Sequence, residues 1–258
     1  RCHACSRSGL NLLLPNMLIE TNAVVLSSLK YGDSSLIARC YCKKLGLKSF
    51  LLKGILSSKK GALKKSLFQP LNIISLITQV KNENHERLEF IKEAKVYFPL
   101  VEIPSDIKKN AITIFLSEVL TKVISEDGAP NNSLYHFIEK YVIHLEVKEF
   151  SPLFHLKFVL ELTNHLGFYP NQLNLKEDFF DLENGCFCCS CTSKYVIEGE
   201  SVNALKKLLG TNFEDLAQIT LSNTLRSKVL SILIDYFNLH LQGFGKIKSV
   251  DILHEIFL

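Results

Sequence analysis

The spacing of apolar residues divides the chain into two parts. Up to about residue 99, apolar and polar residues alternate with a period of two, as in the run 36–42, where Ile37, Arg39 and Tyr41 share one face. This period is typical of half-buried strands. Strands are expected at 23–26, 36–42, 48–53 and 71–80, with a turn at 27–34 and a mixed closing segment at 87–97. Five strands within roughly eighty residues predict a small closed barrel.

Beyond residues 99–104 the apolar period changes to about three and a half, the spacing of amphipathic helices. Candidate N-cap residues are Ser105, Asn132 or Ser133, and Ser151. Further helices are expected at 151–167, 202–209, 222–241 and 248–257. The sequence therefore predicts an α+β protein. An OB-fold β-barrel at 17–99 precedes an all-helical domain at 100–258, which holds an irregular cysteine-rich loop near 171–195.

Residues 1–16 differ in character from the rest of the chain. Met17 is the only methionine, and the strand pattern begins directly after it. The apolar run 10–14 contains Asn11 and is too short for the core of a signal peptide. We therefore expect Met17 to be the natural start and residues 1–16 to be a non-native leader.

Charge is strongly segregated along the chain. The net charge is +4, but no Asp or Glu lies between Ser34 and Asn82, where ten basic residues gather. The lysine-rich loop 53–70 on its own could be a solvated surface loop. A field of one sign, however, raises the local concentration of an anionic ligand. The residues expected to bind nucleic-acid phosphates are Arg39, Lys43, Lys44, Lys48, Lys53, Lys59, Lys60, Lys64 and Lys65.

The sequence disfavours a membrane partner and an enzymatic activity. The basic residues do not follow one amphipathic helix, and no apolar run approaches the ~18 residues that span a bilayer. No Walker loop, HExxH motif or Ser-His-Asp order is present. Aromatic residues in the basic region, Tyr31 and Tyr41 among them, make base stacking plausible, whereas Phe50 and Phe68 fit the barrel core better.

Four cysteines crowd into six residues: Cys186, Cys188, Cys189 and Cys191. Structural zinc is usually held by two CxxC pairs separated by a loop, and four thiolates this close cannot easily surround one ion. One pair could still bind zinc with ligands from elsewhere in the chain. We expect a reduced surface loop and no cofactor, with zinc absent or substoichiometric. The clustering of the cysteines fits a reducing cytoplasm better than a disulfide scaffold.

Short motifs follow one another in a characteristic order along most of the chain. They are AVVL at 23–26, YGDSSLI at 31–37, KG at 53–54 before the basic loop, SLFQPL at 66–71, FLSEVL at 115–120, and FVLEL at 158–162 with LGFYP at 166–170. Their order and spacing resemble those of the bacterial RecO family of recombination mediators. The cysteines depart from this pattern, because many members carry two separated CxxC pairs that hold zinc. Here the chain is similar to the branch that lost the zinc finger.

The resemblance implies a DNA-repair factor that is not an enzyme. Family members bind single- and double-stranded DNA through the barrel, anneal complementary strands and, with RecR, help to load RecA onto DNA covered by single-stranded-DNA-binding protein. The acidic, apolar C-terminal tail of that protein implies a groove with a few basic residues among Leu and Phe in the helical half. A cytoplasmic, nucleoid-associated location is expected. Two alternatives stay open: an RNA-binding barrel protein of translation or ribosome maturation, and an enzyme whose site the motifs do not reveal.

Overall fold

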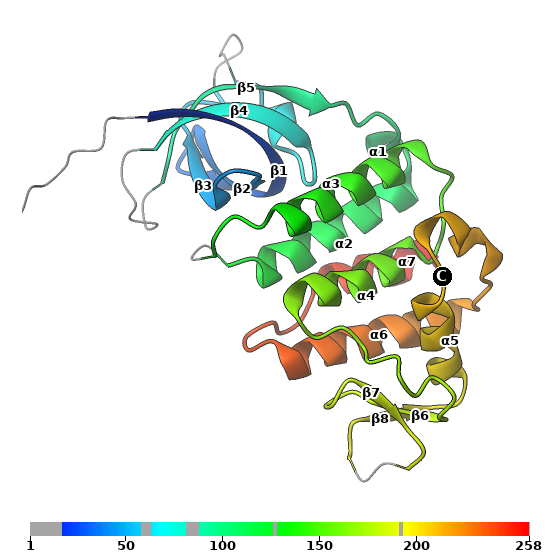
Figure 1. The fold of residues 1–258 in the computed structure, drawn as a ribbon. Helices are drawn as coiled ribbons and strands as arrows, with labels where there is room; N and C mark the ends of the chain where they lie inside the picture. The colour runs from blue at the N-terminus through cyan, green and yellow to red at the C-terminus, as the bar shows by residue number, and fades with distance from the viewer. Residues whose placement is uncertain (1–16, 58–62, 81–87, 126–127, 191–192, 258) are drawn as a thin grey trace, which may run out of the picture.

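The computed structural model describes residues 17–57, 63–80, 88–125, 128–190 and 193–257. The expected leader at 1–16 and three predicted site residues, Lys59, Lys60 and Cys191, lie outside these ranges. Figure 1 shows a β-sheet at one end of the molecule, layers of helices below it and a small second sheet at the opposite end. The fold is α+β, as predicted. None of the described helices is long and apolar enough to cross a membrane.

Five antiparallel strands form the N-terminal sheet in the order β3-β2-β1-β4-β5. They are β1 Met17–Tyr31, β2 Ser35–Cys42, β3 Gly46–Leu52, β4 Ile73–Val80 and β5 Ile91–Phe98. The first half of β1 pairs with β4, and the second half pairs with β2. The register shifts between Val25 and Ser27, and β1 continues through this bulge to Tyr31. The sequence had predicted a turn from residue 27, so the strand is longer than expected.

This sheet is OB-like but does not form a closed barrel, which corrects the prediction made from the strand count. Among the described residues, a single bridge between Phe50 of β3 and Glu89, just before β5 begins, joins the two edges of the sheet. Glu89 N donates to Ser49 O at 3.0 Å, and Leu51 N donates to Glu89 O at 2.9 Å. The short 3-10 helix η1 (Lys65–Phe68) packs against β1 and β5. The strand edges are therefore joined by one bridge instead of a continuous ladder.

The two faces of the sheet belong to different cores. The even positions of β2 face an inner core, as the alternation predicted, and Phe50 and Phe68 are buried there as expected. The helices cover part of the opposite face through Val24, Leu26, Tyr41 and Leu47. Tyr41 Oη also donates to the carbonyl oxygen of Asn131 at 3.2 Å. The outer face of the sheet and the helices therefore share one core, while the inner face packs around a second core of its own.

Helices form the layers below the sheet. They are α1 Glu102–Ser105, α2 Ile107–Val123, α3 Asn132–Val147, α4 Phe154–Leu166, α5 Glu200–Leu209, the 3-10 helix η2 Phe213–Gln218, α6 Asn223–His240 and α7 Ser249–Phe257. The predicted cap Ser105 ends α1, and Asp106 caps α2 by accepting from Lys108 N at 2.7 Å. Asn131, one residue before the predicted candidates, caps α3. Gly167, with φ 88°, ends α4 in the left-handed conformation that glycine tolerates.

A small second sheet corrects the prediction of an all-helical C-terminal domain. Its strands β6 Phe179–Asp181, β7 Cys186–Cys188 and β8 Val196–Glu198 lie in and beside the stretch predicted to be an irregular loop. Phe180 and Phe187 are buried, with ring centroids 4.8 Å apart, and Phe180 also packs against Tyr236 of α6. Strands of three residues are too short for their alternation to be recognised in the sequence.

Two carboxylates from neighbouring helices hold helix N-termini in place. Glu146 of α3 accepts from the N–H groups of residues 101–103, at the start of α1, at 2.7, 2.8 and 3.0 Å. Glu118 of α2 accepts from the N–H groups of residues 248–249, at the start of α7, at 2.9 and 2.8 Å. Burial by itself would raise the pKa of both carboxyls, but the hydrogen bonds outweigh burial and lower both pKa values.

Candidate nucleic-acid interface and partner groove

The predicted basic residues are spread over both ends of the β2–β3 hairpin. Lys43 and Lys44 occupy the turn between the strands, and Lys53 directly follows β3 at the other end. Strands of this length separate the two ends by roughly 20 Å. The turn end lies against the helical part, where a Cβ on Gly46 would come within 3.1 Å of Gly128 O. The predicted residues that the structure describes therefore do not form one contiguous patch.

Lys48 lies on the inner face of the sheet, and Arg39 lies on the outer face. Lys48 pairs in register with Cys40, whose side chain belongs to the inner core, and its Nζ is 3.6 Å from Glu89 Oε1. Both side chains are largely enclosed, with 14% and 12% of their surface exposed. Arg39 pairs with Ser49. An enclosed, ion-paired lysine is poorly placed to reach a phosphate, whereas Arg39 remains a candidate.

The outer face of β1, β2 and β3 carries an apolar row. Leu29, Ile37 and Leu51 lie directly opposite one another on the three strands. Leu29 is 65% exposed, and Tyr31, two residues further along β1, is 53% exposed. Large apolar side chains gathered at the surface are typical of a binding site.

Phe90 extends this row at the edge of β3. It follows Glu89 at the bridge between the sheet edges and is 41% exposed, and Lys53 Nζ lies 5.0 Å from the centroid of its ring. Leu29, Tyr31, Ile37, Leu51 and Phe90 together form a surface that we call the outer platform. Sequence reasoning identified Tyr31 and Lys53 but missed Phe90, because Phe90 lies beyond the acid-free segment. An aromatic residue next to a strand start was the available signal.

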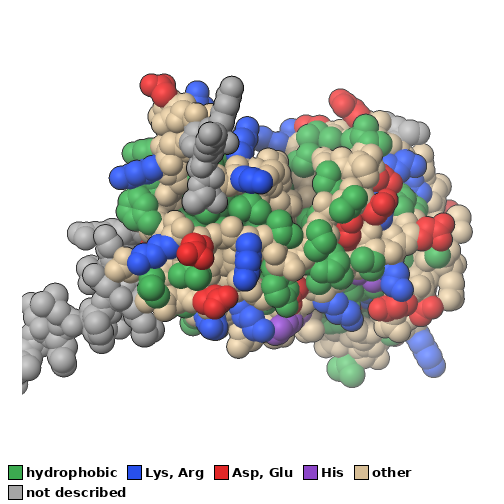
Figure 2. Space-filling view, turned by 90° about the horizontal axis from the view of Figure 1, so that it is seen from above, with side chains coloured by type: hydrophobic (Ala, Val, Ile, Leu, Met, Phe, Trp, Pro, Cys, Tyr) green, Lys and Arg blue, Asp and Glu red, His purple; other side chains and the backbone are tan. Residues whose placement is uncertain are grey.

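The described parts of the lysine loop are anchored to the same sheet. Leu56 N donates to Ser34 O at 2.9 Å, which ties the beginning of the loop to the turn between β1 and β2. Ser28 Oγ donates to Phe68 O at 2.7 Å, which fixes the end of the loop. The exposed lysines of these parts are Lys53, Lys64 and Lys65. Figure 2, which views the molecule from the side of the sheet, shows Lys and Arg side chains interspersed with apolar ones.

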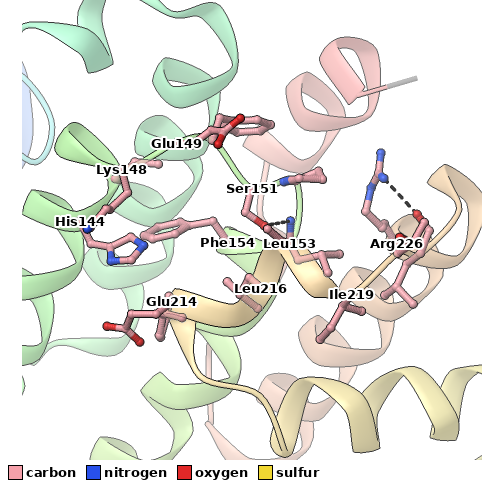
Figure 3. A pocket seen from close by; sticks show the side chains of 17 residues that line it. His144, Lys148, Glu149, Ser151, Leu153, Phe154, Glu214, Leu216, Ile219 and Arg226 are labelled. Atoms are coloured by element: carbon pink, nitrogen blue, oxygen red, sulfur yellow. Dashed lines mark hydrogen bonds between the residues drawn. The ribbon is translucent and has the colours of Figure 1, made fainter.

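A groove of about 500 Å³ opens in the helical part of the molecule. It lies between the end of α3, the segment leading into α4, η2 and the start of α6. Figure 3 shows Phe154, Leu216 and Ile219 between His144 on one side and Arg226 on the other. The other charged residues of the lining are Lys148, Glu149 and Glu214. The lining combines Leu and Phe with basic residues, as expected from the sequence, but it also holds two carboxylates.

Arg226 is firmly held at one side of this groove. Its Nη1 donates to Leu221 O at 3.1 Å and its Nη2 to Asn223 Oδ1 at 2.5 Å. It forms no ion pair with a carboxylate in the part of the chain that the structure describes. Burial lowers the pKa of Arg226, but a guanidinium stays charged at neutral pH. A partly buried positive charge without a counter-ion favours an anionic ligand.

The described residues do not gather the predicted cysteines into a metal centre. Phe187 is buried, so Cys186 and Cys188 lie on the opposite face of β7, and Cys189 is exposed. Among the residues with described positions, no group of three or more His, Cys, Asp or Glu side chains could hold a metal ion. Since Cys191 lies outside those residues, the absence of bound zinc stays a prediction.

Fold and surface together define a class of protein: an OB-like sheet with an exposed aromatic and basic face, packed on a helical bundle that has its own groove. Residues 17–99 match the family described as recombination protein O N terminal, and residues 104–250 match recombination protein O C terminal. The chain therefore belongs to the recombination protein O (RecO) family, which confirms the resemblance carried by its motifs.

Known relatives match along their whole length. The chain is 38% identical to the DNA repair protein RecO of Christiangramia forsetii, 39% identical to that of Flavobacterium johnsoniae and 37% identical to that of Flavobacterium psychrophilum. Each alignment covers 93% of this chain and 100% of the relative. The names of the family and of these relatives assign them to DNA repair and recombination.

Proposed function

We propose that this chain is a DNA-binding recombination mediator. It binds single- and double-stranded DNA, anneals complementary strands and, with RecR, helps to load RecA onto DNA covered by single-stranded-DNA-binding protein. It works in the cytoplasm at the nucleoid, without catalysis and without a bound cofactor. The observation that carries the proposal is the outer platform, where exposed aromatic and apolar side chains lie beside Lys53 on an OB-like sheet.

The outer platform offers a DNA strand two kinds of contact. Tyr31 and Phe90 present exposed rings, and a base stacked on such a ring gains roughly 1–3 kcal/mol. Lys53, beside Phe90, can neutralise a phosphate without reading sequence, and Lys64 and Lys65 are exposed further along the same loop. Neither contact uses the pairing edges of the bases. A bound strand therefore remains free to pair with its complement, which annealing requires.

An annealing assay with complementary oligonucleotides tests this role. The double variant Tyr31→Ala/Phe90→Ala removes both exposed rings and should weaken single-strand binding by about tenfold or more, with annealing falling in parallel. Tyr97→Ala is the matched control, because Tyr97 is also 53% exposed but lies on β5 outside the platform. Unchanged binding in the double variant, or an equal loss in the control, would exclude the platform as the DNA site.

The same assay separates DNA from RNA as the ligand. Oligonucleotides of one sequence, made as DNA and as RNA, compete for the labelled strand. Comparable affinity or a preference for DNA is expected, because stacking and phosphate contacts do not require the 2′-hydroxyl. A strong preference for RNA would favour the alternative role in translation or ribosome maturation.

The groove in the helical part is proposed to hold the acidic, apolar C-terminal tail of single-stranded-DNA-binding protein. Phe154, Leu216 and Ile219 offer apolar surface for the tail's hydrophobic side chains. Arg226 and Lys148 offer positive charge for its carboxylates. Complementary charge sets the register of such a ligand and speeds its capture.

Fluorescence anisotropy with a labelled tail peptide tests the groove. Lys148→Glu and Ile219→Glu each place a negative charge in the lining and should weaken peptide binding by about tenfold or more. Lys228→Glu is the matched control, because Lys228 is exposed on α6 but does not line the groove. DNA binding should stay intact in all three variants. If both groove variants bind the peptide as tightly as the control does, the tail docks elsewhere.

A further inference from the structure

The permanent charges in the lining of the groove cancel one another. Lys148 and Arg226 are positive at neutral pH, and Glu149 and Glu214 are negative. Among the described residues of the lining, His144 is the only histidine, and histidine is the side chain that ordinarily changes charge between about pH 5 and pH 8. The net charge that a ligand meets in this groove therefore depends on the protonation of His144.

His144 lies half-buried in the last turn of α3, against aromatic rings of two other parts of the chain. Its ring is stacked on Phe154 with centroids 5.9 Å apart, and it lies edge-on to Phe213 at 6.0 Å. Figure 3 shows the imidazole beside Phe154, with Glu214 nearby. The C-terminal end of a helix and neighbouring aromatic rings both stabilise a positive charge. This place in the groove can therefore hold an imidazolium.

Without a ligand, the neutral imidazole is favoured. Burial lowers the pKa of His144 from its ordinary value of 6.5, and the opposite charge of Glu214 on η2 raises it only in part. Lys148 and Lys140, one helical turn away on either side along α3, lower the pKa further. The other charged groups of the lining are Glu149, before α4, and Arg226, in the first turn of α6. His144 is therefore neutral at physiological pH until a negative charge approaches it.

We propose that His144 takes up a proton when an acidic peptide binds in the groove, so that binding strengthens as pH falls below neutral. This inference rests on the proposed function for its occupant, the acidic and apolar tail. Carboxylates of the tail offset the charges of Lys140 and Lys148, and the imidazolium gives the lining one net positive charge. Because the pKa of His144 is then higher in the complex than in the free protein, affinity is constant above the pKa of the complex. It rises as pH falls through that value and levels off below the pKa of the free protein.

Fluorescence anisotropy with the labelled tail peptide, measured from about pH 8 down to about pH 5.5, tests this proton uptake. A pKa that rises by about half a unit to one unit on binding makes the affinity about three- to tenfold higher at the low end of this range. A second peptide, in which every acidic residue is replaced by its amide, should bind with an affinity that does not change with pH. The Cε1–H signal of His144 in the NMR spectrum, identified by its loss in His144→Gln, should titrate at higher pH with the tail peptide than without it.

Variants of His144 assign the pH dependence to this side chain. His144→Gln, which is always neutral, should show the weaker, high-pH affinity at every pH, whereas His144→Lys, which is always positive, should approach the tighter, low-pH affinity throughout. His136→Gln on α3 is the control, because the side chain of His136 is 54% exposed and lies outside the lining, and it should keep the wild-type pH dependence. A wild-type affinity that does not change with pH, or a pH dependence that survives in His144→Gln, would overturn this inference and leave the proposed occupant intact. Absence of peptide binding at every pH would overturn both.

Discussion

Lys48 and Lys53 carry the same charge and lie five positions apart in the same stretch of chain, yet their surroundings are opposite. Lys48 is enclosed beside Glu89 on the inner face of the sheet, whereas Lys53 is exposed above the ring of Phe90. The alternation in β2 allowed the faces of Arg39 and its neighbours to be predicted. The role of Lys48 could not be predicted, because its counter-ion lies far away in the sequence, beyond the acid-free segment.

Replacing the four lysines of the loop with alanine should weaken DNA binding without changing stability. The substituted residues are Lys59, Lys60, Lys64 and Lys65. The slope of log affinity for DNA against log salt should shrink by roughly 0.7–0.9 per lost contact, while the free energy of unfolding changes by no more than about 0.5 kcal/mol. An unchanged salt slope with full annealing would mean that the loop is only a solvated surface.

Lys48→Ala should behave in the opposite way. It removes the amine that lies 3.6 Å from the enclosed carboxylate of Glu89, at the bridge that joins the sheet edges. Stability should fall by about 1–3 kcal/mol, and the salt slope of DNA binding should stay at the wild-type value. Urea unfolding and salt titration of the same protein preparations measure both quantities. A reduced salt slope without loss of stability would place Lys48 at the DNA after all.

At the scale of elements, strands and helices long enough to repeat their apolar pattern were predictable. Short elements, and those stabilised by residues far away in the sequence, were not. The period of two predicted β2, and the helical spacing predicted a helix over 222–241, which is α6 with its N-cap at Ser222. The second sheet escaped because each strand has three residues. The four-residue helix α1 escaped because Glu146, some forty residues later, holds its start. Such contacts are made by the fold and leave no local pattern.

The N-terminus of α1 makes stability dependent on pH. The pKa of Glu146 is lowered in the folded protein from its ordinary value of 4.5. Its carboxylate therefore stabilises the fold above the unfolded-state pKa, and this contribution disappears as pH falls through the folded-state pKa. Glu146→Gln should cost about 1–3 kcal/mol at pH 7 and should make the loss of stability on acidification shallower. Glu149→Gln, at an exposed position nearby, is the control in urea unfolding across this pH range.

At the scale of the whole molecule, the sheet and the helices share a hydrophobic core. The sequence predicted two domains that meet near residue 99. The last strand of the sheet ends at Phe98 and the first helix begins at Glu102. Nothing in the sequence indicated that Val24, Leu26 and Tyr41 are buried against helices, because an apolar residue on a strand fits either face. The groove was predictable only as a composition, since its walls come from four elements brought together by the fold.

Tyr41→Ala tests whether the sheet and the helices unfold together. Tyr41 is 3% exposed in the core that the sheet shares with the helices, so its truncation should destabilise the protein by about 3–5 kcal/mol. A single urea transition, displaced equally in far-UV circular dichroism and in tyrosine fluorescence, is expected. The chain contains no tryptophan, so tyrosine emission is directly measurable. Two separated transitions would show that the halves unfold independently.

The shared core also fixes the distance between the two proposed binding sites. On the proposed function, a DNA strand on the outer platform and a tail in the groove are held at a constant separation, since no hinge between sheet and bundle can adjust it within their common core. For two tethered contacts the effective concentration is greatest when the tether matches the span between the sites, and it collapses when the tether is too short. The tether of the protein that carries the tail must then span the whole distance between the two sites. Progressive shortening of that protein's tether should therefore raise avidity slowly down to the length that matches the span and abolish it below that length.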